Sequence, residues 1–110
     1  MKEMYIYNVT INIDDSVHHE WLKWMKEVHI PDVMDTGLFL RNRILEVMVD
    51  EESGKTYSIQ YTVKDLETLR LYQEVYASRL QQEHIDKFEG KFVSFRTILR
   101  VEHEFERDND

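Results

Sequence analysis

His29 is the residue of this chain best suited to proton transfer, because only an imidazole has an unperturbed pKa close to neutrality. It follows a segment whose apolar residues recur at helical spacing, namely Val17, Trp21, Trp24, Met25 and Val28. One turn after Met25, His29 lies at the edge of that stripe. We therefore predict a histidine at the rim of an apolar cavity, acting as a general base or as a ligand's hydrogen-bond partner. The alternative is structural, since a histidine near a helix C-terminus caps free carbonyls and is favoured by the helix dipole.

Large apolar side chains close to His29 predict what that cavity would bind. We expect a small, partly apolar molecule between the first helix, the turn over residues 31–37 and the sheet. Its lining residues would be aromatic or adaptable side chains: Tyr7, Trp21, Trp24, Met25, Met34 and Phe39. The simpler interpretation of the two tryptophans is that they anchor the first helix in the core.

Histidine spacing argues against a metal site. His18 and His29 are eleven residues apart, so on one helix their backbones are separated by roughly 16 Å. His19 and Glu20 are helical neighbours of His18, and adjacent helical positions diverge by about 100°. The chain has no cysteine, and its three glycines form no phosphate-binding loop. We expect neither a metal nor a cofactor.

Alternating apolar and polar residues predict strands over residues 4–13 and 56–63. A second strand is expected over residues 38–49, with a bulge near residues 41–43 and a hairpin loop over residues 50–54. The last strand is expected over residues 92–101.

Two amphipathic segments predict the helices between these strands. One of the residues 14–16 should cap the first helix. Pro31 should end it and bias Ile30 toward an extended conformation. Asp65 should cap the second helix, and residues 82–89 either continue that helix or kink away from it. The buried stripe of the second helix would be Leu66, Leu69, Tyr72, Tyr76 and Leu80.

The predicted order is β-α-β-β-α-β, which indicates an α+β, ferredoxin-like fold with a four-stranded antiparallel sheet and two helices on one face. We expect a single domain over residues 1–103 and a charged, frayed tail over residues 104–110.

The sheet face away from the helices is expected to be mixed in polarity, which suits a homodimer that closes into an α/β barrel. We place Val93, Phe95, Leu99 and Val101 under the helices. The opposite face would carry Ile6, Asn8, Thr10, Ser58, Gln60, Arg96, Ile98 and Arg100. Four of these are the predicted dimer-interface residues: Asn8, Gln60, Arg96 and Arg100. The alternative is a plain solvated face. We expect Arg96 and Arg100 to form ion pairs between strands or across the interface, and the alternative is that they bind an anionic substrate.

Charge and composition limit the partners. The net charge is −8, so nucleic acid and anionic membrane surfaces are not expected partners. No apolar run approaches the ~20 residues that span a bilayer, and the N-terminus lacks a signal-peptide core. We expect a soluble cytoplasmic protein.

Four strings of the sequence carry a family resemblance: MYIYNVTINI, WLKWMKEVHIPDVMDTG, YSIQYT and GKFVSFRT. They resemble a family of small bacterial proteins known only as a domain of unknown function, which is similar to the dimeric α/β-barrel superfamily. The resemblance implies a fold and a homodimer, and no activity. Haem-degrading members of that superfamily use a strand-1 asparagine, a tryptophan and a second-helix histidine. Asn8 matches here, but the third strand has no tryptophan and the second helix has no histidine before His84.

Three functions remain open at this point. The first is a homodimeric protein that binds a small molecule beside His29. The second is a non-catalytic interaction or regulatory module whose main role is dimerisation. The third, drawn from the resemblance, is an enzyme similar to cofactor-free monooxygenases or isomerases.

Overall fold

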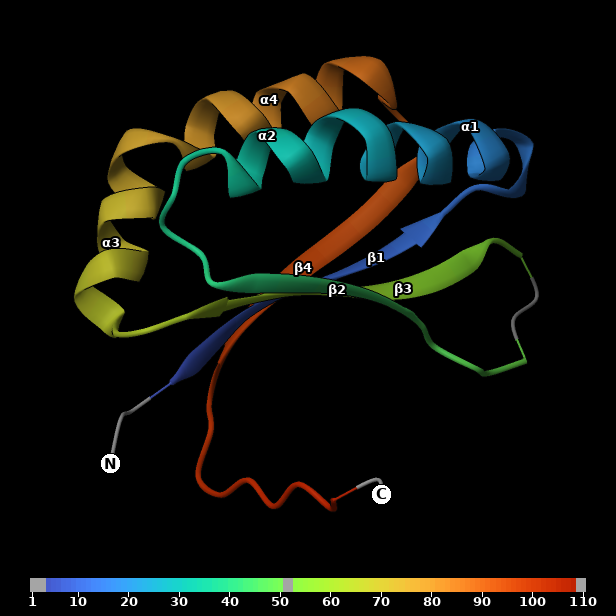
Figure 1. The fold of residues 1–110 in the computed structure, drawn as a ribbon. Coiled ribbons are helices and arrows are strands. Elements are labelled where there is room, and N and C mark those ends of the chain that lie inside the picture. Colours follow the sequence, from blue (N-terminus) through green and yellow to red (C-terminus); the bar gives the residue numbers. More distant parts are fainter. Residues whose placement is uncertain (1–3, 51–52, 109–110) are drawn as a thin grey trace.

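The fold is a single antiparallel sheet with helices on one face (Figure 1). The computed structural model describes residues 4–50 and 53–108. The strands are β1 (Tyr5–Ile13), β2 (Arg41–Glu46), β3 (Lys55–Val63) and β4 (Phe92–Arg100). The helices form two segments of the chain. The first helical segment comprises η1 (Asp15–Val17), α1 (His18–Trp24), η2 (Met25–His29) and α2 (Ile30–Met34), and the second comprises α3 (Leu66–Val75) and α4 (Ala77–Lys87). The strand order β2-β3-β1-β4 confirms the predicted ferredoxin-like arrangement.

The central strands β1 and β3 form the base of the core. They pair antiparallel, with Tyr7 opposite Tyr61 and Val9 opposite Ile59. Every second residue of β1, from Tyr5 to Ile13, is buried beneath the helices. The alternation predicted from the sequence is therefore confirmed for both strands.

The first helical segment passes through Pro31 without a break, so the predicted end of the helix at that residue is wrong. Residues Met25–His29 form a π-helical turn, in which the Ile30 N–H donates to the carbonyl of Met25. This wider turn leaves Pro31 in the first turn of α2, where a backbone N–H is not needed. Ile30 is itself helical, with φ −62° and ψ −45°, and not extended as predicted.

The second helical segment is broken at Tyr76 and not near residue 82, so residues 82–87 continue α4, which is the first of the two predicted alternatives. The Asp65 carboxylate accepts a hydrogen bond from the Thr68 N–H at 2.7 Å, which confirms the predicted cap. The chain changes direction at Tyr76, between α3 and α4. Leu66 of the predicted stripe is exposed. In α4 the buried positions are Ala77, Leu80 and His84.

The two faces of strand β4 are exchanged relative to the prediction. Its pairing with β1 sets Arg96 opposite Val9 and Arg100 opposite Tyr5, and paired residues point to the same side of a sheet. Arg96, Ile98 and Arg100 therefore face the helices. The residues predicted to lie under the helices, Val93, Phe95 and Leu99, lie instead on the open face. Val101 follows the strand, and its N–H donates to the carbonyl of Met4.

Strand β2 is shorter than the predicted span of residues 38–49. It pairs with β3 in one continuous register from Arg41 to Glu46, so the bulge predicted near residues 41–43 is wrong. The loop predicted over residues 50–54 includes residues 51 and 52, which lie outside the described residues.

The open face of the sheet combines a polar centre with an apolar border. Asn8 accepts from the Ser58 hydroxyl at 2.6 Å and donates to Thr97 and Thr10. Along β4 the side chains of Val93, Phe95 and Leu99 are 70%, 61% and 41% exposed. The C-terminal residues after β4 run back below this face (Figure 1).

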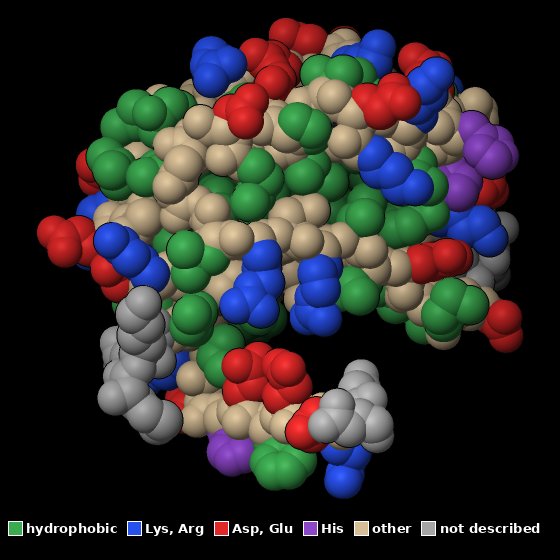
Figure 2. Space-filling view, in the orientation of Figure 1, with side chains coloured by type: hydrophobic (Ala, Val, Ile, Leu, Met, Phe, Trp, Pro, Cys, Tyr) green, Lys and Arg blue, Asp and Glu red, His purple; other side chains and the backbone are tan. Residues whose placement is uncertain are grey.

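A hollow of about 290 Å³ separates that tail from the sheet. Basic side chains above it face acidic side chains below (Figure 2). Its charged residues are Arg41, Arg43, Glu104 and Glu106. None of the helices in the described part of the chain is long and apolar enough to cross a membrane.

Candidate functional site

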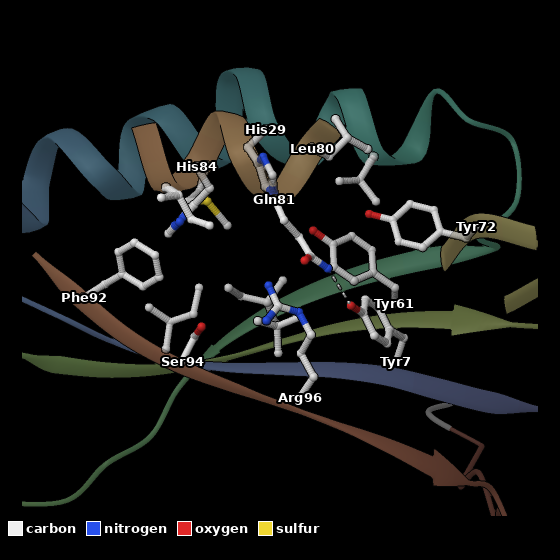
Figure 3. Close-up of a pocket in the computed structure, with 16 residues that line it drawn as sticks. Tyr7, His29, Tyr61, Tyr72, Leu80, Gln81, His84, Phe92, Ser94 and Arg96 are labelled. Carbon is white, nitrogen blue, oxygen red and sulfur yellow. Dashed lines mark hydrogen bonds between the residues drawn. The ribbon is translucent and has the colours of Figure 1, made fainter. Parts of the chain in front are cut away.

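A cavity of about 150 Å³ lies between the helices and the sheet (Figure 3). Its floor comes from β1 and β3, its roof from η2, α2 and α4, and one side from β4. The lining residues with polar side chains are Tyr7, His29, Tyr61, Tyr72, Gln81, His84, Ser94 and Arg96. The rest of the lining is apolar, including Met25, Val33, Ile59 and Leu80. Because Ile85 and Arg96 are exposed whereas Ile11 and Leu80 are buried, the cavity opens between α4 and β4.

The protonation of His84 is fixed by Trp21. The indole Nε1–H of Trp21 donates to His84 Nε2 at 2.9 Å. An indole nitrogen is only a donor, so His84 Nε2 must be unprotonated. Burial, and then repulsion from the protonated form of His29 and from Arg96, lowers the pKa of His84 to about 4. At neutral pH the ring is therefore uncharged and carries its proton on Nδ1.

His29 lies beside His84 and has an unsatisfied nitrogen. Its ring stacks on Trp24, with centroids 5.1 Å apart, and meets His84 edge to face at 5.8 Å. Its Nδ1 is buried and has no hydrogen-bond partner among the described residues. Burial is the main cause that lowers the pKa of His29 to about 4; nearby Asp32 raises it and Arg96 lowers it further. His29 is thus a neutral imidazole that can form a hydrogen bond to a bound molecule.

Three tyrosines surround the other end of the cavity. The Gln81 amide donates to the Tyr7 hydroxyl at 3.4 Å. Burial raises the pKa values of Tyr61 and Tyr72, so both phenols stay protonated. Figure 3 shows the Tyr61 hydroxyl pointing toward the space near Gln81. This end of the cavity therefore offers phenolic hydroxyls.

Arg96 supplies the cavity's only charge among the described lining residues. Figure 3 shows its guanidinium extending from β4 toward Gln81. No carboxylate lines the cavity, and Arg96 forms no ion pair with any described residue. The guanidinium is therefore free to meet a ligand at the cavity mouth.

The structure brings together three of the seven residues predicted for ligand binding or catalysis: Tyr7, Met25 and His29 all line the cavity. The other four do not line it. Trp21 is fully buried and supports His84, whereas Trp24 packs on the far side of His29. Phe39 stacks behind Tyr7 in the core. Met34 is half-buried at the end of α2.

The four predicted interface residues separate into two pairs. Asn8 and Gln60 lie on the open face, as predicted. Arg96 and Arg100 are on the helix side, because they pair with residues of β1 whose side chains point toward the helices. Arg100 lies over the Tyr5 ring and pairs with Glu102 at 4.0 Å.

Sequence reasoning missed His84, Gln81, Tyr61 and Tyr72 as cavity residues. A signal was available for His84, which follows Leu80 by one helical turn and so shares its buried face. A histidine on an apolar helix face needs a partner, and Trp21 provides it.

Solved structures share this fold. A dimeric ferredoxin-like protein from an uncultured marine organism matches with a TM-score of 0.72 and 19% sequence identity. The match covers 94% of this chain and 99% of the other chain. A second such protein from an uncultured marine organism matches with TM-score 0.70 and 9% identity over 96% and 100% of the two chains. SnoaB, a cofactor-independent oxygenase from Streptomyces nogalater, matches with a TM-score of 0.66 and 9% sequence identity over 97% of this chain and 100% of its own chain.

A search of curated proteins finds no match. A family model described as "Domain of unknown function (DUF4286)" matches residues 4–102, which include all four strands, both helical segments and every residue that lines the cavity. This chain therefore belongs to the DUF4286 family of domains of unknown function.

Proposed function

We propose that this protein is a homodimer in which each subunit binds a small, partly apolar molecule in the cavity beside His29. The observation that carries the proposal is the unsatisfied, buried His29 Nδ1 at the wall of an open cavity. Buried polar atoms without a partner are rare in folded proteins and need an explanation. A ligand that hydrogen-bonds to His29 provides one.

The cavity volume limits the size of that molecule. An engineered apolar cavity of about 150 Å³ in another protein binds benzene or xenon. The cavity here has the same volume, about 150 Å³, but polar groups line part of it. It therefore suits a single ring, or an aliphatic body of similar size, that carries a hydrogen-bonding group.

Phenol is a suitable first probe, because it is one neutral ring whose hydroxyl can donate a hydrogen bond to a nitrogen of His29. We expect a titration followed by NMR to shift the amide signals of cavity residues. His29→Phe should keep the ring stacked on Trp24 but remove the acceptor, and so weaken phenol binding about tenfold. The thermal midpoint should stay the same or rise, since the variant removes an unsatisfied buried nitrogen.

His19→Phe is the matched control, because His19 is exposed and does not line the cavity. It should leave phenol affinity unchanged. If wild-type protein shows no shifts at cavity residues, the binding proposal is wrong and the dimerisation module becomes the better explanation. A large loss of stability in His29→Phe without a change in affinity would assign His29 a structural role.

The dimer is proposed to form through the open face of the sheet. The apolar side chains of Val93, Phe95 and Leu99 form an exposed row there, and such rows mark interaction surfaces. The polar centre around Asn8 and Gln60 would meet its symmetry copy at the axis, as a two-fold interface requires. Two solved proteins of this fold are described as dimeric, which supports a dimer.

Light scattering should give twice the subunit mass for the wild-type protein at micromolar concentration. Phe95→Glu should give the mass of one subunit, because it places a charge in the centre of the apolar row. Val28→Glu, on an exposed position of the helical layer, is the control and should remain dimeric. A monomeric wild type, or a dimeric Phe95→Glu variant, would contradict an interface at this face.

Catalysis without a cofactor is a second candidate function. A neutral imidazole beside a small, mostly apolar cavity can accept a proton from an acidic C–H or O–H of a bound substrate. SnoaB, which shares the fold, is a cofactor-independent oxygenase. Consumption of dissolved oxygen with a substrate that binds, and its loss in His29→Phe, would favour this candidate over binding alone.

A further inference from the structure

Hydrogen-bond donors dominate the polar lining of the cavity. The guanidinium of Arg96 carries five N–H groups and no acceptor. His84 carries its proton on Nδ1 because Trp21 occupies Nε2, and Nδ1 has no acceptor in the described part of the chain. The hydroxyls of Tyr61 and Tyr72 likewise donate to none of the described residues. Acceptors are fewer, chiefly the Gln81 carbonyl and one nitrogen of His29.

A donor-rich cavity favours a ligand rich in acceptors. A bound neutral ring would leave most of these donors without a partner, which costs free energy for each one. A carboxylate has two oxygens with about four acceptor sites and no donor. Its geometry also matches the parallel N–H groups of one guanidinium.

The charge balance of the site points the same way. Arg96 is the only ionised group among the described lining residues, and no described carboxylate pairs with it. Around the cavity, Asp32 acts on His29 from outside the lining, and Arg79 pairs with Glu83 on the exposed side of α4. One uncompensated positive charge matches one negative charge. A doubly charged phosphate would exceed it.

We propose that the ligand of this cavity is a small organic monocarboxylate, with its apolar body beneath α2 and α4 and its carboxylate on Arg96 at the mouth. The inference rests on the proposed binding function and narrows it to a chemical class. In this arrangement Arg96 anchors the ligand and the buried half of the cavity selects its size. His29 and His84 face the end of the ligand away from Arg96, where a second polar group of the ligand, such as a hydroxyl, would pair with them.

Benzoate and benzamide form a pair that tests the charge alone, since they have nearly the same shape and only benzoate is ionised at pH 7. Wild-type protein should bind benzoate at least tenfold more tightly than benzamide in an NMR titration. Arg96→Gln should abolish that preference and leave benzamide affinity within about twofold. Arg96→Lys should retain part of it, because the charge remains while the bidentate geometry is lost.

Arg79→Gln is the control, because it removes the same charge near the cavity from a residue that does not line it. It should keep the full preference for benzoate. Equal binding of the two compounds by wild-type protein, or a preference that survives Arg96→Gln, would overturn the monocarboxylate class while the binding site itself stands. If neither compound shifts cavity residues, the proposed binding function fails, and this inference fails with it.

Discussion

Trp21→Ala is expected to lower the free energy of unfolding by about 3–5 kcal/mol, the range for truncating a large buried aromatic side chain. Trp21 is 0% exposed, and its ring centroid lies 5.2 Å from that of Tyr57. Its removal would leave a cavity between the first helical segment and the sheet, and would also remove the hydrogen bond that Trp21 donates to His84. Chemical denaturation at one fixed protein concentration measures the loss, because the proposed dimerisation would make stability depend on concentration.

Two further variants separate the contributions of Trp21. Trp24→Ala should cost less, since Trp24 is half-buried and forms no hydrogen bond in the described structure. Trp21→Phe keeps most of the ring and leaves His84 Nε2 unsatisfied, which should cost about 1–3 kcal/mol. In combination with His84→Leu the losses should not add, because the two residues share one hydrogen bond. Equal losses for Trp21→Ala and Trp24→Ala would show that Trp21 is not the anchor.

The overall fold was readable from the sequence because its strongest patterns are local. The alternation of β1 and β3 has only one side that can face a core, so both strands were predicted correctly. Asp65 was identifiable for the same reason, since a capping carboxylate acts on an amide three residues away. These features need no knowledge of distant parts of the chain.

The orientation of β4 could not be read in the same way. Both faces of Phe92–Arg100 carry apolar residues, so the strand's own pattern does not choose between them. Pairing with β1 decides, and it sets Arg96 opposite Val9. This single shift moves Arg96 from the predicted interface to the cavity, where it becomes the anchor of the proposed ligand.

The cavity depended on contacts between residues far apart in sequence. His29 was identified from its local setting, but its neighbour His84 lies 55 positions later in the chain. Their contact depends on two irregularities, the π-turn that carries the helix through Pro31 and the change of direction at Tyr76. Neither has a pattern in the sequence as clear as strand alternation, so the pairing of His29 with His84 was missed.

Acid is expected to destabilise this protein in the range where its buried histidines titrate. The pKa of His84 is about 4 in the folded protein, below the value of 6.5 expected in the unfolded chain. The unfolded chain therefore binds more protons below pH 6.5, so stability is complete above that pH and falls as the pH decreases toward 4. Between pH 7.5 and 4.5 the loss from His84 should be on the order of 2–3 kcal/mol. His29, whose pKa is also lowered to about 4, should add to this loss over the same range.

His84→Gln should flatten that pH dependence, because glutamine does not titrate and its side-chain oxygen can still accept the Trp21 N–H. His19→Gln is the control, since His19 is exposed and should leave the slope unchanged. Free energies of unfolding measured by denaturation at several pH values between 7.5 and 4.5 give the comparison. The carboxylates with lowered pKa values, Asp14 and Asp65, stabilise the folded protein above about pH 4 and lose that stabilisation mainly below it, so most of their effect lies outside this range. A wild-type curve that is flat from pH 7.5 to 4.5, or an equal slope in His84→Gln, would mean that His84 is not held neutral by burial beside Trp21.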